Sequence, residues 1–179
     1  MSHSNVLWWS LAAVAMAVLV TTGSGPLPIR WAKLSDLHPQ ARERFVALFH
    51  AIEAAGYQVV LTSGYRPGDT LDYHYFGLAQ DFNLIESATG KWYRAADNFD
   101  KAAWEATGVP AIIRAHGFRW GGDFKTPWVY KGVTHPGYDP IHADLGKTYM
   151  ISGLRAKALL LAKNTPLPQF DGRKVPLTA

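Results

Sequence analysis

Two histidines and one aspartate are the residues of this chain whose types and spacing could perform chemistry. His74 and Asp81 lie seven positions apart in the stretch His-Tyr-Phe-Gly-Leu-Ala-Gln-Asp, and His142 follows much later in the chain. Two imidazoles and one carboxylate form a three-ligand set for zinc that leaves one coordination position free for water. Such an open position is typical of catalytic zinc sites, because the metal lowers the pKa of its water to about 7.

Each of these candidate ligands also has an ordinary structural explanation. A single histidine in a loop, such as His74, is most often a polar surface residue. Asp81 lies within the apolar run 78–85, where a buried carboxylate needs a cation because burying an unpaired charge is costly. Zinc or a buried arginine could supply that cation. His142 lies in a second apolar run, 140–145, and it also requires a polar partner, which favours the metal.

Two further residues could assist a metal-bound water. Asp139 precedes His142 by three positions, close enough to accept a proton from the water without binding the metal. The dipeptide Asp139-Pro140 is otherwise typical of a simple turn. Arg66 ends the stretch Ser-Gly-Tyr-Arg at 63–66, and its permanent charge could stabilise an oxyanion or hold a substrate carboxylate. Most arginines on such loops have no catalytic role.

The composition excludes several other kinds of site. The chain has 179 residues and no cysteine, so zinc fingers, disulfide frameworks and thiol nucleophiles are all excluded. Its formal net charge of +4 is spread along the sequence, without the basic runs that indicate a nucleic-acid partner. We therefore expect no nucleic-acid binding. A weakly basic surface suits an anionic polymer such as a bacterial cell wall, although solubility alone explains it equally well.

Hydrophobic periodicity predicts the helices and short strands that must position these side chains. The clearest signal is an apolar stripe at helical spacing within 38–56, which begins with a His-Pro pair and ends at a glycine. The predicted elements are, in order, a helix at 38–56, strands at 57–62 and 78–85, helices at 98–107 and 110–116, strands at 118–120 and 140–145, and a helix at 151–163, with a loop at 123–138. Helices first and last, with short strands between them, indicate the α+β class.

The first 29 residues differ from the rest of the chain. No Asp, Glu, Lys or Arg occurs from Ser2 to Ile29, and Val6 to Val20 is apolar apart from Ser10. Those residues would rise only about 22 Å as a helix, against a hydrocarbon core of about 30 Å, but the uncharged residues that follow lengthen the span. We therefore predict an exported protein, periplasmic or membrane-tethered, in which this N-terminal hydrophobic helix is a signal peptide or an anchor.

One alternative to this interpretation of the N-terminus stays open, and one observation opposes export. The segment could be a buried helix of a cytosolic protein, although its paired tryptophans and its Gly-Ser-Gly-Pro end are unusual for one. The basic residues that follow the apolar run also oppose translocation, because positive charge tends to remain on the cytoplasmic side. Whether the segment is cleaved is not determined by the sequence.

Four motifs, taken together, resemble the family of bacterial and phage zinc D,D-carboxypeptidases and L-alanyl-D-glutamate endopeptidases. This family includes VanY-like and VanX-like enzymes and shares its fold with Hedgehog-like domains. The motifs occur in the family's order: Ser-Gly-Tyr-Arg at 63–66, His-x-x-Gly-x-Ala-x-Asp at 74–81, Phe-Arg-Trp-Gly-Gly-Asp-Phe at 118–124, and Asp-x-x-His at 139–142. The similarity extends over roughly residues 35 to 147.

The resemblance implies a small α+β domain of the Hedgehog/D-Ala-D-Ala-peptidase type, with an antiparallel sheet flanked by helices. It implies that Zn²⁺ is bound by His74, Asp81 and His142. Asp139 would be the general base, and Arg66 would stabilise the oxyanion or orient the substrate. The substrate would be the stem peptide of peptidoglycan, hydrolysed by a monomeric, endolysin-like enzyme. An aspartate base is typical of the endopeptidase branch, which favours cleavage between L-Ala and D-Glu over D-Ala-D-Ala carboxypeptidase activity.

We accordingly divide the chain into an apolar segment with a linker at 1–29, a zinc peptidase domain at 30–165 and a loose tail at 166–179. The alternative function is a non-catalytic module that binds the cell wall or a partner and keeps zinc for stability. Asp139 and Arg66 argue against that alternative, because a structural zinc site needs neither. His135, in the aromatic stretch 124–138, is left as either a surface residue or a contact to the metal or the substrate.

Overall fold

The computed structural model describes residues 29–66, 72–94, 100–130, 132–135 and 137–150. The apolar segment, the helix predicted at 151–163 and the tail lie outside these ranges. The described elements are, in order, the 3₁₀ helix η1 (Ile29–Asp36), α1 (Pro39–Ala54), β1 (Tyr57–Ser63), β2 (Ala79–Glu86), β3 (Trp92–Tyr93), α2 (Lys101–Ala106), α3 (Val109–Ala115), β4 (Arg119–Trp120), the 3₁₀ helix η2 (Gly121–Asp123), β5 (Trp128–Tyr130), β6 (Val133–His135) and β7 (His142–Asp144). None of the helices in the described ranges has the length and apolar character needed to span a bilayer.

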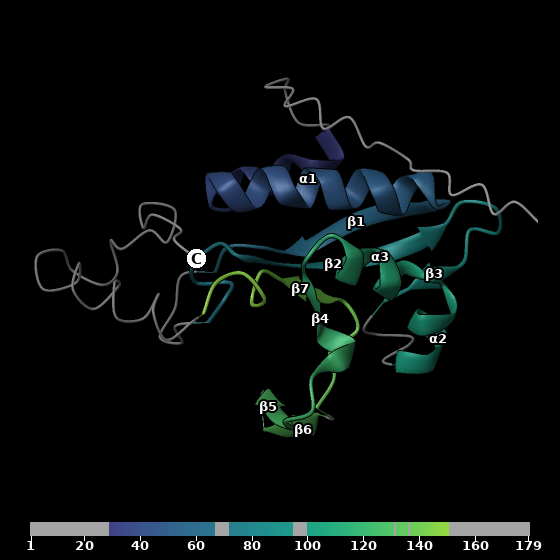
Figure 1. Ribbon diagram of the computed structural model, residues 1–179. Helices are drawn as coiled ribbons and strands as arrows, with labels where there is room; N and C mark the ends of the chain where they lie inside the picture. Colours follow the sequence, from purple (N-terminus) through teal and green to yellow (C-terminus); the bar gives the residue numbers. More distant parts are fainter. Residues whose placement is uncertain (1–28, 67–71, 95–99, 131, 136, 151–179) are drawn as a thin grey trace, which may run out of the picture.

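The longest of the described helices, α1, forms where the apolar stripe predicted it. Pro39 occupies the first turn, where a missing N–H costs nothing, and the ring Nδ1 of His38 accepts a hydrogen bond from the backbone N–H of Gln40 at 3.3 Å. The buried side of the helix carries Ala41, Phe45, Leu48, Phe49 and Ile52. In Figure 1 this helix lies along one face of the sheet, so its stripe forms one wall of the hydrophobic core.

The main sheet is antiparallel and has five strands in the order β1-β2-β7-β4, with β3 paired to the outer part of β2. This arrangement confirms the predicted α+β class with an antiparallel sheet flanked by helices. The central position of β2 and β7 is important for the site, because their register places Asp81 directly opposite His142. The pairing of β1 with β2 shifts in register between Leu61 and Ser63, and Ser63 is the residue of β1 that pairs with Asp81.

Side chains along β2 alternate between the core and the opposite face of the sheet. Phe82 packs against Phe49 of α1, with ring centroids 5.2 Å apart. Because successive side chains of a strand point to opposite faces, Asp81 projects away from α1. The same alternation on β7 places Ala143 in the core and turns His142 toward the face that carries Asp81. The candidate ligands therefore sit on the sheet surface opposite the long helix.

One predicted loop contains a hairpin. The segment 123–138 was expected to lack regular structure, but β5 and β6 pair in it as antiparallel strands, with Trp128 opposite His135. Gly132, between them, has a φ of 77°, the left-handed conformation that short hairpin turns require. Figure 1 shows this hairpin on the side of the sheet away from α1.

Candidate metal centre

Three ligand atoms from distant parts of the chain meet at one point. His74 Nε2 lies 3.2 Å from Asp81 Oδ1 and 3.1 Å from His142 Nδ1, and the last two atoms are 2.9 Å apart. The three residues expose only 3%, 7% and 8% of their surface, respectively. Among the described residues they form a group of the kind that can hold a metal ion. These are the residues that the sequence analysis selected, and their binding of an ion stays a prediction.

The backbone explains how the three side chains come together. Asp81 and His142 face each other across the β2–β7 pair, a position in which neighbouring Cβ atoms are about 5 Å apart. His74 belongs to the turn that enters β2, and this turn is anchored where the backbone N–H of His38 donates to the carbonyl of Gly77 at 3.1 Å. Gly77 has a φ of 65°, and a Cβ there would lie 2.7 Å from the His38 nitrogen. Only glycine permits this approach.

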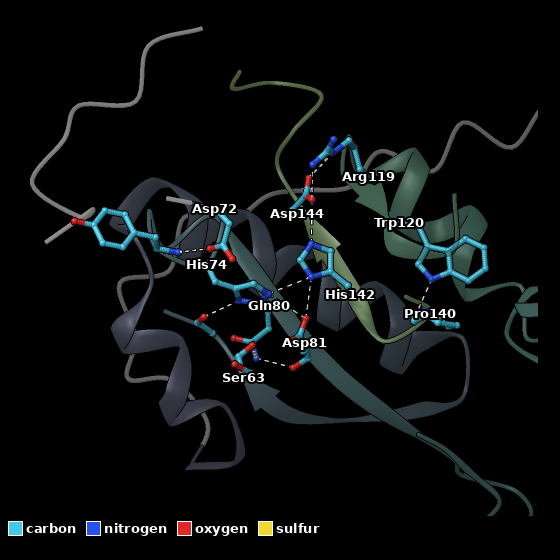
Figure 2. Close-up of polar contacts among 12 residues, drawn as sticks. Ser63, Asp72, His74, Gln80, Asp81, Arg119, Trp120, Pro140, His142 and Asp144 are labelled. Atoms are coloured by element: carbon cyan, nitrogen blue, oxygen red, sulfur yellow. Dashed lines mark hydrogen bonds and ion pairs between the residues drawn. The ribbon is translucent and has the colours of Figure 1, made fainter. Parts of the chain in front are cut away.

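Hydrogen bonds on the far side of each ring determine which nitrogen faces the cluster. His74 Nδ1 lies 2.7 Å from the carbonyl oxygen of Gly64, which can only accept, so Nδ1 carries the proton and Nε2 keeps its lone pair. His142 Nε2 lies 3.0 Å from Asp144 Oδ2, so the neutral ring likewise presents a lone pair at Nδ1 (Figure 2). Two lone pairs and one carboxylate oxygen of Asp81 then point at each other. This donor set fits a divalent cation, because only a positive charge relieves the repulsion.

In the absence of an ion, a proton takes the place of that positive charge. Burial raises the pKa of Asp81, but its close contacts with the rings of His142 and His74 more than offset that effect and hold the pKa well below its usual range. Burial lowers the pKa of His142, yet hydrogen bonds to Asp144 and Asp81 outweigh it and raise the pKa to about 10. At neutral pH the metal-free protein therefore holds an extra proton on His142, between two carboxylates.

Metal binding is accordingly expected to release about one proton per ion at pH 7. The metal-free ring is protonated below its pKa of about 10, whereas a coordinated ring is neutral, so the ion must displace the proton. The apparent affinity should then rise about tenfold for each pH unit, or about 1.4 kcal/mol. Calorimetric titration with zinc in buffers of different ionisation enthalpy measures the number of protons directly. Release of none would contradict the assigned protonation of His142.

Asp139 lies beside the cluster and has an unusual environment. Its Oδ1 is buried and has no hydrogen-bond partner among the described residues. Burial raises the pKa of Asp139, and the nearby Asp81 raises it further, against the opposing charges of His142, His74 and Arg66. A buried acceptor without a partner is costly, so this oxygen is available to an atom that the described residues do not supply.

Gly121, directly after β4, holds the backbone of Asp139 in place. The carbonyl oxygen of Gly121 accepts a hydrogen bond from the Asp139 N–H at 2.8 Å. A Cβ on Gly121 would lie 2.1 Å from the Asp139 carbonyl oxygen and 2.8 Å from the Cβ of His142. A larger residue at 121 could not occupy this position. Gly121, the first glycine of the third motif, therefore allows the loop of Asp139 to close against the metal centre.

The other residues named from the sequence have different positions. Arg66 is exposed, its backbone N–H donates to the carbonyl of His74 at 3.2 Å, and its charge acts on Asp139. It therefore borders the centre, although its guanidinium makes no hydrogen bond to a described residue. His135 lies in β6 and is not part of the three-residue group.

Sequence reasoning missed two residues that hold the centre in place. The carboxylate of Asp144 accepts a hydrogen bond from Nε2 of His142, on the side of the ring away from the cluster. Arg119 donates two hydrogen bonds to the same carboxylate. A signal for Asp144 was present, because His-x-Asp on a strand places both side chains on one face. Arg119 had no comparable signal, since its distance from Asp144 in the sequence is bridged only by the pairing of β4 with β7.

Comparison with known proteins adds an independent observation. A sequence profile of the family described as D-alanyl-D-alanine carboxypeptidase matches residues 67–131. No curated protein is similar enough to the chain to count as a match. The matched stretch includes His74, Asp81 and the pair Gly121-Gly122, and it ends before Asp139 and His142. It confirms the family resemblance inferred from the motifs.

Proposed function

We propose that this chain, as a relative of a family of zinc-dependent peptidases, is a zinc metallopeptidase that hydrolyses a peptide bond in the stem of peptidoglycan. The family match supports a metal-dependent hydrolase. The observation that carries the proposal is the buried group His74, Asp81 and His142 with Asp139 beside it, whose buried Oδ1 has no hydrogen-bond partner among the described residues. A structural metal site would not need that carboxylate.

The donor set supports zinc as the ion. Two imidazole nitrogens and one carboxylate oxygen suit zinc, whereas calcium and magnesium prefer oxygen ligands alone. When bound, zinc supplies a Lewis acid and lowers the pKa of an attached water. The protein contributes the geometry: Gly64 and Asp144 orient the two rings. Asp81 contributes the negative charge that offsets part of the charge of the ion.

Asp139 is assigned the role of general base. Its carboxylate accepts the proton of the attacking water and returns that proton to the leaving amine, so that no net proton is gained or lost. Its raised pKa suits this exchange, because a base works best when its pKa approaches the working pH. Arg66 is assigned to hold the substrate carbonyl oxygen or a substrate carboxylate, for which an exposed guanidinium at the border of the centre is suited.

We propose endopeptidase cleavage between L-Ala and D-Glu rather than removal of the terminal D-Ala. The aspartate at position 139 supports this choice, because carboxypeptidases of the family more often have glutamate there. The substrate lies outside the cytoplasmic membrane, so the function requires export. The uncharged segment at 1–29 is the candidate signal or anchor for it, and we propose that the exported enzyme acts as a monomer.

Digestion of purified sacculi with analysis of the released fragments tests this proposal. Endopeptidase activity should release fragments with a new amino-terminal D-Glu, and carboxypeptidase activity should release free D-Ala. We expect the first result, its loss on addition of a chelator, and its return on addition of zinc. Binding to sacculi without any cleavage, by protein with its full content of zinc, would favour the non-catalytic module and contradict the proposed enzyme.

A further inference from the structure

The carboxylate of Asp144 is fully buried and uses both oxygens. Oδ2 accepts hydrogen bonds from His142 Nε2 at 3.0 Å and from Arg119 Nη2 at 2.7 Å. Oδ1 accepts from Arg119 Nε and from the backbone N–H of Gly146, both at 2.7 Å. Four donors converge on an acceptor-only group, so the carboxylate is ionised and cannot rotate without losing several bonds.

Arg119 is itself held in one place. Its guanidinium lies 4.7 Å from the ring centre of Tyr73 and 5.2 Å from that of Phe124, within the range of cation–π attraction. A Cβ on Gly146 would lie 2.1 Å from Arg119 Nε, so the glycine leaves the room that the arginine occupies. Arg119 and Asp144 are also directly opposite in the pairing of β4 with β7. Figure 2 shows the resulting row from Arg119 through Asp144 to His142 and Asp81.

We propose that Asp144, held by Arg119, is a positioning residue that keeps the proton of His142 on Nε2 and directs its Nδ1 lone pair at the metal. This inference rests on the proposed metal centre and assigns a role to residues that the proposed function does not use. A histidine that binds metal through Nδ1 must carry its proton on Nε2, and a fixed acceptor at Nε2 makes that tautomer the stable one. A ring with its proton on Nδ1 would present a hydrogen to the ion.

A purely structural explanation is the alternative. Arg119 and Asp144 could simply join β4 to β7, without influence on the metal. The chain contains a second pair for comparison, because Arg114 also binds Asp123 with two hydrogen bonds, at 2.8 and 2.7 Å. That pair has the same forked geometry, but Asp123 is exposed and makes no hydrogen bond or ion pair with any of the three ligands. Asp123→Asn is therefore the control for loss of an Arg–Asp fork.

The test compares the zinc affinity of Asp144→Asn, Asp123→Asn and the unchanged protein, by competition with a chromophoric chelator. An asparagine can turn its amide N–H toward Nε2 of His142 and so favour the wrong tautomer. We expect Asp144→Asn to bind zinc about 10- to 100-fold more weakly, and Asp123→Asn to bind it unchanged. Circular dichroism verifies that each variant is folded. The proposal would be overturned if folded Asp144→Asn bound zinc as tightly as the unchanged protein. That result is expected if the Arg119–Asp144 pair only joins β4 to β7.

A second measurement needs no variant and applies even if Asp144→Asn does not fold. In zinc-loaded protein labelled with ¹⁵N at histidine, the nitrogen spectrum should show a protonated Nε2 and a metal-bound Nδ1 for His142. The opposite assignment would overturn the proposal. Both measurements use zinc alone, without substrate. Absence of zinc binding by the unchanged protein would remove the metal centre and this role together, whereas failure to cleave sacculi would affect only the proposed peptidase activity.

Discussion

Replacement of Asp139 by asparagine is expected to slow stem-peptide hydrolysis by about 10²- to 10⁴-fold while zinc stays bound. Asparagine has nearly the same shape as aspartate but cannot accept a proton. Asp139 is outside the group of three ligand residues, so the ion should remain. Because Asp139 must be ionised to accept a proton, the rate should rise with pH as its carboxylate loses its own proton. This rise of the rate with pH should disappear in the Asp139→Asn variant.

The measurement is kcat/KM on a soluble stem-peptide fragment across pH, together with zinc content. Asp100→Asn is a suitable control. Asp100 is exposed at the start of α2, where its carboxylate accepts a hydrogen bond from the backbone N–H of Ala102 at 2.9 Å, and asparagine caps helices equally well. That variant should keep full activity. Full activity of Asp139→Asn with its zinc retained would remove Asp139 from the mechanism.

Asp81→Asn is expected to lose both zinc and activity. Of the three ligand residues, Asp81 is the one that brings negative charge, and its Oδ1 lies within 3.2 Å of both ring nitrogens. An uncharged amide cannot offset the charge of the ion, and its N–H₂ group would point hydrogens at the site. The loss of zinc affinity should therefore exceed the roughly 10- to 100-fold loss expected for an outer partner such as Asp144.

Elemental analysis of purified protein after dialysis measures the bound zinc. Glu86→Gln is the control, because it removes the same charge at the far end of β2. The Glu86 carboxylate accepts a hydrogen bond from the hydroxyl of Thr89 and does not face the site. This control should bind one zinc and remain active. If Asp81→Asn bound zinc as tightly as Glu86→Gln, Asp81 would not be a ligand, and the proposed centre would have to be redrawn.

The sequence was sufficient for the features that depend on neighbours along the chain. The stripe from Phe45 to Ile52 predicts α1 because helical spacing is a local property, and β1 and β2 follow from short apolar runs for the same reason. The absence of cysteine excludes metal sites built on thiolates, and two imidazoles with one carboxylate form a ligand set that suits zinc. The hairpin at 128–135 was missed because its strands are short and only Gly132 marks the turn.

The tertiary structure decided which side chains share a face and which atoms they turn toward each other. A shift of β7 by one residue would have placed His142 in the core and Ala143 opposite Asp81, with no change in sequence. The same register brings Arg119 to Asp144 and thereby fixes the far side of the His142 ring. Strand register is set by packing across the whole sheet. The residue types of the site were therefore readable from the sequence, whereas the geometry that allows them to hold an ion arises only when the strands pair.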